Sequence, residues 1–557
     1  MSNRSLLGAL ISLLLITLPV RADVRYVDVD APVSGSGNAW CDAFTDLQDA
    51  LAIAQAGDEI RIAAGTYTPD QGTGDFLISF EIPNGVMLQG GYAGRGAGDS
   101  ADGDPLANPT LLSGDLNGDD GPDFSNYEDN SFIVVRTQQA GADTVLDGLI
   151  IERGNADGPM NQYDRGGGMY NWLGGPTLRN CTFRLNASTY GGAVCNDASD
   201  ATLYDCTFED NQAVIGGGSL YTYNSTTKLE QCRFERNRAT NGGGGALYGV
   251  NTEFDIDQST WIENEATNGG ALFGASDTRG RIACSNFMSN AGTAVSLNLA
   301  GQLRFEDCTF EANTGRNSAA VQLSSTEGLF SDCTFVGNQG SSGGALAALS
   351  ASVTMDRCVF ESNASLLGAA GAVLLQSSAT SLIRHCEFRN NVAERGGAMY
   401  VFFDTHAAVQ RSLFLGNQAT QDGGGAIYMP TSDTRLELVG CRFVANTTVG
   451  DGGALNIGRG AELHAVSCAF TGNHADDDGG GAYNDFDSIT SYSNCTFTQN
   501  TAGFSGDGMY NASSDPVIAN SILWNNNGLS TSNQLAGGSP VVDYSCLPGG
   551  WGSPHNI

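Results

Sequence analysis

Apolar and polar residues alternate over short stretches along most of the chain, and one such stretch recurs with a regular spacing. From Cys181 onward, Cys-x-Phe-x-x-Asn, or a variant with Ser in place of Cys, returns every 23 to 29 residues. Cys181 and Phe183 are two residues apart, so in a strand they share one face, while the polar Thr182 between them faces the other way. The pattern therefore predicts short strands that bury one face.

Fourteen copies of this motif occur, and a second motif accompanies them. The copies begin at Cys181, Cys206, Cys232, Ser259, Ser285, Cys308, Cys333, Cys358, Cys386, Ser412, Cys441, Cys468, Cys495 and Ser521. The second motif is Gly-Gly-Ala followed by an aliphatic residue, as at residues 244–247 and 396–399. We expect the motif Asn to form a left-handed corner and to bond to the Asn of the next turn. The Gly pair is expected at a second corner, where adjacent turns approach closely.

The length of the repeat decides between the repetitive folds. About 26 residues hold three short strands and their turns but leave no room for a helix, which excludes leucine-rich repeats and helical solenoids. A propeller blade needs about 40 residues. We therefore predict an all-β chain, a parallel β-helix solenoid of about 14 regular turns in which strands of successive turns pair in parallel.

The two ends of the chain differ from the regular repeats. Residues 1–22 contain an apolar run and end in Val20-Arg21-Ala22, which predicts a cleaved secretory signal peptide. Residues 23–155 are expected to form an N-terminal cap and irregular first turns, and residues 156–530 the regular repeats. Residues 531–557 form a C-terminal end that either closes the coil or is truncated. Thr45-Asp46-Leu47-Gln48 has the spacing of a capping box and predicts a helix that caps the coil.

Charge narrows the range of partners. The 557 residues include 61 Asp and Glu but only 26 Lys and Arg, which gives a formal net charge of −35. Nucleic acid and anionic membrane surfaces bind basic proteins, so both are excluded as partners. After the first 22 residues no apolar stretch is long enough to span a bilayer. We expect a secreted or cell-surface protein that is a soluble monomer.

Ten of the 14 cysteines occupy the first position of the repeat motif. A metal site is disfavoured because no Cys-x-x-Cys or Cys/His cluster occurs. Disulfides between stacked turns are disfavoured because the Ser copies leave Cys in runs of three, four and three, and an odd run cannot pair completely. We therefore expect buried thiols that act as small apolar side chains.

These motifs resemble those of a known group of proteins. The Phe-x-x-Asn and Gly-Gly-Ala-aliphatic pair is similar to the repeat of the chlamydial polymorphic outer-membrane proteins. The stretch from Tyr26-Val27-Asp28 through Trp40 to Gly65-Thr66-Tyr67 resembles secreted bacterial right-handed β-helix proteins. The resemblance implies a right-handed parallel β-helix of the pectin-lyase-like fold, exported to the cell surface or the medium. It implies no reaction, because this fold carries lyases, hydrolases, tailspikes and adhesins.

Acidic residues that precede the Gly pairs are the main candidates for chemistry. Asp422, Asp451 and Asp478 recur at the spacing of the turns, and carboxylates so placed suit calcium. The alternative is a solvated acidic edge with an ion pair between Arg395 and Asp422. A second run, residues 115–121, resembles the start of a calcium loop, but its Gly is displaced from the sixth position.

Two functions remain open at this point. The first is an exported, non-catalytic scaffold for adhesion or carbohydrate interaction, whose partner is a polysaccharide or a ligand on a host or neighbouring cell. The alternative is a calcium-dependent, pectate-type polysaccharide lyase, with Arg395 as the base and Asp422, Asp451 and Asp478 as calcium ligands. Calcium is the one cofactor that the pattern indicates.

Overall fold

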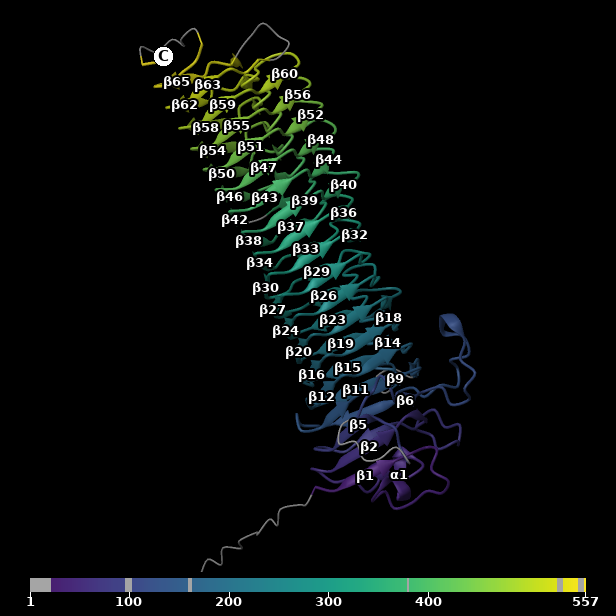
Figure 1. The fold of residues 1–557 in the computed structure, drawn as a ribbon. Coiled ribbons are helices and arrows are strands. Elements are labelled where there is room, and N and C mark those ends of the chain that lie inside the picture. Colours follow the sequence, from purple (N-terminus) through teal and green to yellow (C-terminus); the bar gives the residue numbers. More distant parts are fainter. Residues whose placement is uncertain are drawn as a thin grey trace, which may run out of the picture.

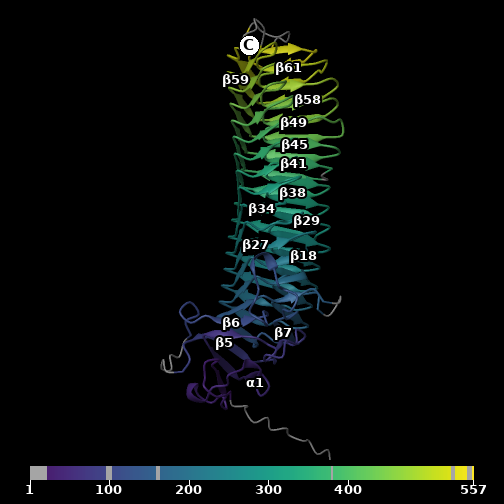
Figure 2. The same ribbon diagram turned by 90° about the vertical axis from the view of Figure 1, so that its right-hand side faces the viewer.

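The computed structural model of the protein describes residues 22–95, 103–158, 163–377, 380–527, 534–548 and 555–556. These residues form an elongated coil in which short parallel strands stack into ladders along its length (Figures 1 and 2). All but the last residue of the predicted signal peptide, residues 1–22, lies outside the described residues. Within the described ranges, no helix is long and apolar enough to cross a membrane.

The predicted capping helix is present as α1 (Leu47–Leu51) at the N-terminal end of the coil (Figure 1). It lies against β1 (Val24–Val27), the first strand. Its N-cap is Asp46, whose side chain accepts a hydrogen bond from the backbone N–H of Gln48 at 2.8 Å. The capping box predicted to start at Thr45 is therefore displaced by one residue, because the carboxylate of Asp46 satisfies the first exposed N–H itself.

One regular turn of the coil consists of four short strands. These are β34 (Glu327–Ser331), β35 (Thr334–Val336), β36 (Gln339–Gly340) and β37 (Leu346–Leu349). Each pairs in parallel with its counterpart in the next turn. We name the three long ladders sheet A, which contains β34, sheet B, which contains β35, and sheet C, which contains β37. The parallel solenoid predicted from the repeat is confirmed.

Sheet C positions the candidate site. Its strands are β4 (Phe80–Ile82), β7 (Val135–Gln138), β11 (Met169–Trp172), β15 (Val194–Asp197), β19 (Leu220–Tyr223), β23 (Leu247–Val250), β26 (Leu272–Ala275), β29 (Val295–Asn298), β33 (Val321–Ser324), β37, β41 (Val373–Gln376), β45 (Met399–Phe402), β49 (Ile427–Met429), β53 (Leu455–Ile457), β57 (Ala482–Asn484), β61 (Met509–Asn511) and β64 (Leu535–Gly537).

The coil is longer than the 14 regular repeats. Among the described residues sheet A contains 19 strands, and sheets B and C contain 17 each. The additional first turns bury aliphatic residues where later turns bury Phe; Ile151, for example, pairs in register with Phe183. At the other end β65 (Val541–Asp543) pairs with the preceding strand of sheet A. These outer turns lack the full motif, so the repeat count does not include them.

The motif Phe residues form the centre of the core. Phe335 is fully buried, and its ring stacks on Phe310 and Phe360 with centroid distances of 4.8 and 4.6 Å. The polar Thr334 beside it is partly exposed. The predicted division of each strand into a buried and a solvent-facing side is confirmed. Stacked rings with parallel planes continue through most turns and give the coil a continuous apolar centre.

The motif Asn residues form a second buried ladder. Asn338 Nδ2 donates to Asn363 Oδ1 at 2.9 Å and to the carbonyl of Phe310 at 2.9 Å. The predicted bonding between stacked Asn amides is confirmed. The predicted left-handed backbone at Asn is wrong: the residue before it, such as Gly337 (φ 62°) or Ser362 (φ 55°), takes that conformation. The corner falls there because the Asn side chain is turned inward to bond with its neighbours.

The motif cysteines lie in the core beside the Phe ladder as free thiols. Cys333 is fully buried, and its Sγ donates to the carbonyl of Ser331, with a sulfur–oxygen distance of 3.3 Å. Cys41 and Cys284, outside the motif position, are exposed. The motif thiols therefore fill space and satisfy their weak donors on the backbone.

Candidate functional site

The outward side of sheet C carries a column of aromatic side chains. In each strand the residue after the buried aliphatic one faces away from the core, and the parallel register places these residues in line from turn to turn. The aromatic members are Tyr170, Tyr221, Tyr248, Phe273, Tyr400, Tyr428, Tyr483 and Tyr510. We call this set the aromatic column. It has a first tract at 170–273 and a second at 400–510.

The Gly pair before each strand determines how the column is placed. Gly244 has a φ of 68°, and a Cβ added to Gly245 would lie 2.1 Å from the carbonyl oxygen of Gly270 in the next turn. The tight corner that was expected at the Gly pair is therefore confirmed. Leu247 then enters the core, so the following residue, Tyr248, must face outward.

The first tract is a near-continuous aromatic surface. The ring centroids of Tyr221 and Tyr248 are 5.5 Å apart, and those of Tyr248 and Phe273 are 5.0 Å apart. Tyr190 lies beside the column, with its ring 5.1 Å from that of Tyr221. Tyr248 and Phe273 are partly exposed. Burial raises the pKa of Tyr221 and of Tyr248, so both hydroxyls remain protonated donors at neutral pH.

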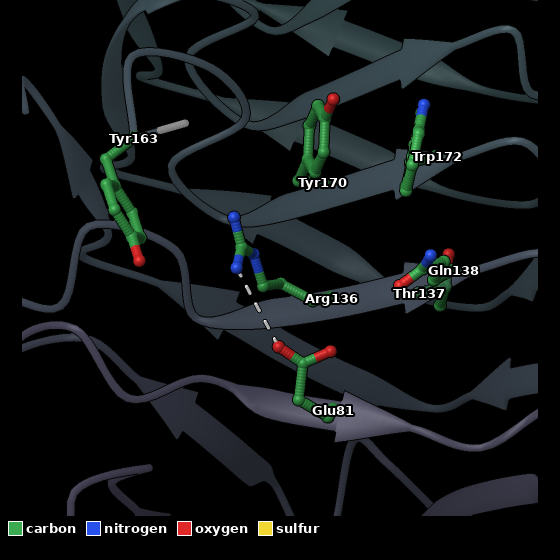
Figure 3. Close-up of a pocket in the computed structure, with 7 residues that line it drawn as sticks. All are labelled: Glu81, Arg136, Thr137, Gln138, Tyr163, Tyr170 and Trp172. Atoms are coloured by element: carbon green, nitrogen blue, oxygen red, sulfur yellow. Dashed lines mark ion pairs between the residues drawn. The ribbon is translucent and has the colours of Figure 1, made fainter. Parts of the chain in front are cut away.

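A cavity of about 460 Å³ lies at the N-terminal end of the first tract (Figure 3). Arg136 of β7 extends into it between two rings, with its guanidinium 5.3 Å from the centroid of Tyr163 and 5.8 Å from that of Tyr170. Nη1 of Arg136 is 3.9 Å from Oε1 of Glu81. Trp172, 41% exposed, lies alongside Tyr170 in the same wall (Figure 3). The cavity therefore combines flat apolar rings with one cation and one carboxylate.

The second tract is built in the same way. Tyr400 and Tyr428 have ring centroids 5.3 Å apart, and Tyr483 and Tyr510 stack at 5.6 Å with an angle of 14° between their planes. Tyr400 also packs on Leu374 in a small apolar cluster outside the main core. Between the tracts the column consists of small, aliphatic or amide side chains.

The outward side of sheet A has a different character. Charged side chains of opposite sign face one another across neighbouring strands there. Arg281 Nε lies 2.8 Å from Glu306 Oε2, and Arg357 Nε lies 2.7 Å from Asp332 Oδ1. Ion pairs so exposed contribute little to stability and keep the surface hydrated. The extended aromatic surface is therefore a feature of sheet C.

The three aspartates predicted as calcium ligands lie on successive turns, but two of them are occupied with the backbone. Asp451 Oδ1 accepts a hydrogen bond from the N–H of Asp478 at 3.0 Å, and Asp478 Oδ1 accepts one from the N–H of Ser505 at 2.8 Å. Asp422 is exposed and lies against Gly450. The three do not form a group with ligand oxygens within 4.8 Å; in the described part of the chain, that criterion selects Asp115, Asp119 and Asp120 instead.

Arg395 is exposed and lies beside the second tract of the aromatic column. Its guanidinium is hydrogen-bonded to the hydroxyl of Tyr400, which lowers the pKa of that hydroxyl, although burial has the larger effect and raises it. The ion pair expected between Arg395 and Asp422 is not formed among the residues that the structure describes. The base and the carboxylates of the lyase alternative are therefore not assembled around one point.

Sequence reasoning missed the aromatic column, although its signal is present. The residue that follows Gly-Gly-Ala-aliphatic is aromatic in several copies, as in Tyr248, Phe273, Tyr400 and Tyr428. Attention to the buried residues of the motif left this outward position unexamined. An outward position that keeps an aromatic residue over several turns is more informative about binding than the core positions.

Comparison with protein-family models identifies the class of protein. The model described as "Right handed beta helix region" matches residues 123–264, 232–352 and 268–470, which together span more than half of the chain. The chain therefore belongs to the right-handed β-helix family. Its coil is thus right-handed, as the resemblance of the N-terminal stretch implied.

More specific comparisons add little. Among solved structures, a PL6 family alginate lyase, AlyGC, is similar over 90% of this chain and 92% of its own, with 10% identity and a TM-score of 0.24. A TM-score this low carries no argument about activity. The comparison with curated proteins finds no match.

Proposed function

We propose that the protein is an exported, non-catalytic scaffold that binds neutral polysaccharide along the aromatic column. The observation that supports this most is the line of partly exposed rings on sheet C, at one ring per turn over consecutive turns. The faces of sugar rings carry aliphatic C–H groups, and these stack on aromatic side chains that would otherwise be exposed to water. An extended sugar chain that runs along the coil meets a new ring at each turn.

The polar groups beside the rings suit sugar hydroxyls. The raised pKa values of Tyr170 and Tyr483, which result mainly from burial, keep these phenols as hydrogen-bond donors. Carboxylates such as Asp197, close to Tyr170, are acceptors. A flat apolar surface edged by donors and acceptors fixes the orientation of a sugar without requiring charge on it.

The charge of the protein favours a neutral chain over a polyanion. With a formal net charge of −35, the protein repels an acidic polysaccharide at low ionic strength. Arg136 is partly compensated by Glu81 at 3.9 Å. This distinguishes the proposal from the lyase alternative, which requires a uronate substrate, and Arg395 offers no assembled site for such a reaction.

The partner and the location of the protein follow from the same proposal. A polysaccharide of the medium, of the producing cell or of a neighbouring cell is reached only by an exported chain, and residues 1–22 have the pattern of a secretory signal. The chain is expected to act as a monomer, because the column runs along one side of a single coil. Fractionation of producing cells checks the location directly.

Binding to a panel of soluble polysaccharides tests the function. The panel contains neutral xylan, glucomannan and laminarin together with acidic polygalacturonate and alginate, and affinity is measured by titration calorimetry. We expect binding to at least one neutral member and a loss of at least tenfold in the double variant Tyr248→Ala/Phe273→Ala. The matched control is Tyr204→Ala, a partly exposed tyrosine on sheet A, which should keep full affinity.

The same panel distinguishes the lyase alternative. Each acidic polysaccharide is incubated with the protein and calcium, and the ultraviolet absorbance of unsaturated uronate products is followed. Product formation that is lost in Arg395→Gln would support the lyase and contradict a non-catalytic scaffold. Neutral binding that is unaffected by Tyr248→Ala/Phe273→Ala would remove the aromatic column from the proposal.

A further inference from the structure

The insertion between β6 (Thr110–Ser113) and β7 contains a compact group of acidic side chains. One ligand oxygen from each of Asp115, Asp119 and Asp120 lies within 4.8 Å of the others. No other group of three His, Cys, Asp or Glu side chains in the described ranges meets this condition. We call this segment, residues 114–131, the acidic loop.

The backbone of the acidic loop folds around the first of these carboxylates. Asp115 Oδ1 accepts hydrogen bonds from the N–H of Gly118 at 2.7 Å and of Asp119 at 3.2 Å. The Asp115 side chain is 9% exposed and that of Asp120 is fully buried. Two of the three carboxylates are thus held away from bulk water, which strengthens their interaction with any charge placed between them.

Two buried oxygen atoms beside this group have no hydrogen-bond donor. They are Oδ1 of Asp120 and Oδ1 of Asn130. Asn130 is 1% exposed, and its side chain points into the group, where Nδ2 donates to Asp120 Oδ2 at 2.8 Å. A buried acceptor without a partner is costly, and a carboxylate oxygen can be satisfied only by a donor or a cation. The orphaned oxygens therefore point to a positively charged ligand.

One residue already compensates part of the charge. Arg153 Nη1 is 3.4 Å from Asp115 Oδ2 and 3.2 Å from Asp120 Oδ2. Three carboxylates and one guanidinium leave a net charge of −2 in the group. Arg153 contacts the Oδ2 atoms, so Oδ1 of Asp120 remains available. Burial, and then the charge of Asp115, raise the pKa of Asp120 to about 6, which is still below neutral pH.

We propose that the acidic loop binds one calcium ion, with oxygens of Asp115, Asp119, Asp120 and Asn130 among its ligands. Calcium takes six to eight oxygen ligands in flexible geometry, and backbone carbonyls and water complete such a shell. Magnesium requires near-ideal octahedral geometry and binds this irregular set less well. The site is distinct from the aspartates at 422, 451 and 478 and does not depend on the proposed polysaccharide binding.

The position of the loop gives the ion a structural consequence. Asn130 is followed by Phe132, whose ring lies 5.3 Å from that of Tyr163, a residue that lines the cavity of Figure 3. Asn130 Nδ2 also donates to the carbonyl of Arg153 in the coil at 2.7 Å. A cation between these elements ties the acidic loop to the first turns of the coil and holds Tyr163 in place.

Calcium titration of the full chain, freed of metal by a chelator, tests the site. We expect one calcium ion per chain with a dissociation constant in the millimolar range or below, and at least tenfold weaker binding of magnesium. Asp120→Asn, which keeps the shape of the side chain, should weaken calcium at least tenfold. The matched control Asp123→Asn changes an exposed carboxylate of the same loop and should remain within twofold of the natural protein.

A spectroscopic measurement provides independent evidence. Tyr127 is buried, and its pKa is raised mainly by burial but also by the charges of Asp120 and Asp115, which places it next to the group. Terbium in the site should therefore emit on excitation of Tyr127, and calcium should displace it. Tyr127→Phe should lose the emission and keep the calcium affinity.

The outcomes separate the proposal from its rivals. Circular dichroism in the absence of metal establishes that each variant is folded. Equal calcium affinity of Asp120→Asn and the natural protein would overturn the assignment. So would binding that is lost in Asp451→Asn but kept in Asp120→Asn, or no binding at millimolar calcium.

Discussion

Removal of one amide from the Asn ladder should open the coil locally. In Asn338→Ala, four side-chain hydrogen bonds are lost: Nδ2 to the carbonyl of Phe310 (2.9 Å), Nδ2 to Asn363 Oδ1 (2.9 Å), and Oδ1 from the N–H (3.1 Å) and Nδ2 (2.9 Å) of Asn313. At about 1 kcal/mol each, the loss is about 4 kcal/mol. The Asn313 N–H and the Phe310 carbonyl are left without a partner in a site with no exposure to water.

Hydrogen exchange measured by mass spectrometry is the appropriate assay. A solenoid opens turn by turn, so a single unfolding midpoint for the whole chain is not well defined. A local loss of about 4 kcal/mol accelerates exchange by about three orders of magnitude in peptides of the affected turns, and leaves distant turns unchanged. Thr334→Ala, on the outward side of the same turn, is the control and should change exchange by less than tenfold.

The comparison of the two variants decides the matter. If Asn338→Ala accelerates exchange no more than Thr334→Ala does, the Asn ladder contributes no stability and its buried hydrogen bonds are replaced by other contacts. If the acceleration extends evenly along the coil, the turns unfold as one unit and the estimate by individual turns is wrong.

Three further predictions follow from the core and the acidic edge. Phe335→Ala should cost 3–5 kcal/mol in its turn, as a core truncation, against less than 0.5 kcal/mol for Thr334→Ala, which denaturant melts followed by hydrogen exchange will measure. Cys284 should react with an alkylating reagent in the native protein and Cys333 only after unfolding, as intact mass will record. Burial raises the pKa of Asp451 to about 6, above its ordinary value of 3.8, so the stability associated with its neutral form is complete below about pH 4 and is lost as the pH rises through 6. Asp451→Asn should remove this dependence, worth about 1–2 kcal/mol after allowance for partial exposure, and an unchanged pH profile would contradict the assignment.

The repeated motif made most of the fold predictable. Phe335 and its counterparts must share a buried face with Cys333, and a repeat this short admits only a coil of strands. The location of the left-handed corner was not predictable from residue preference, because Asn338 is held inward by four hydrogen bonds and the corner passes to Gly337. Local propensity was overridden by contacts between turns.

The candidate site was much less predictable. Tyr248 and Phe273 lie in line only because the coil returns each strand to the same register, and the column is interrupted by residues such as Ser296 that carry no aromatic signal. The acidic loop shows the opposite case. Its glycine spacing departs from the familiar calcium loop, yet folding brings Asp115 and Asp120 together through contacts with residues far along the chain.

The central claim is that a neutral polysaccharide lies along the aromatic column, and hydroxyl-radical footprinting tests it most directly. The protein is oxidised with and without a saturating amount of whichever neutral polysaccharide of the panel binds it best, and modification is mapped by mass spectrometry. Protection of Tyr170, Tyr248 and Phe273, with Tyr204 of sheet A unchanged, is the predicted result. Protection of Tyr204 alone, or no protection of the column while the polysaccharide is bound, would contradict the claim.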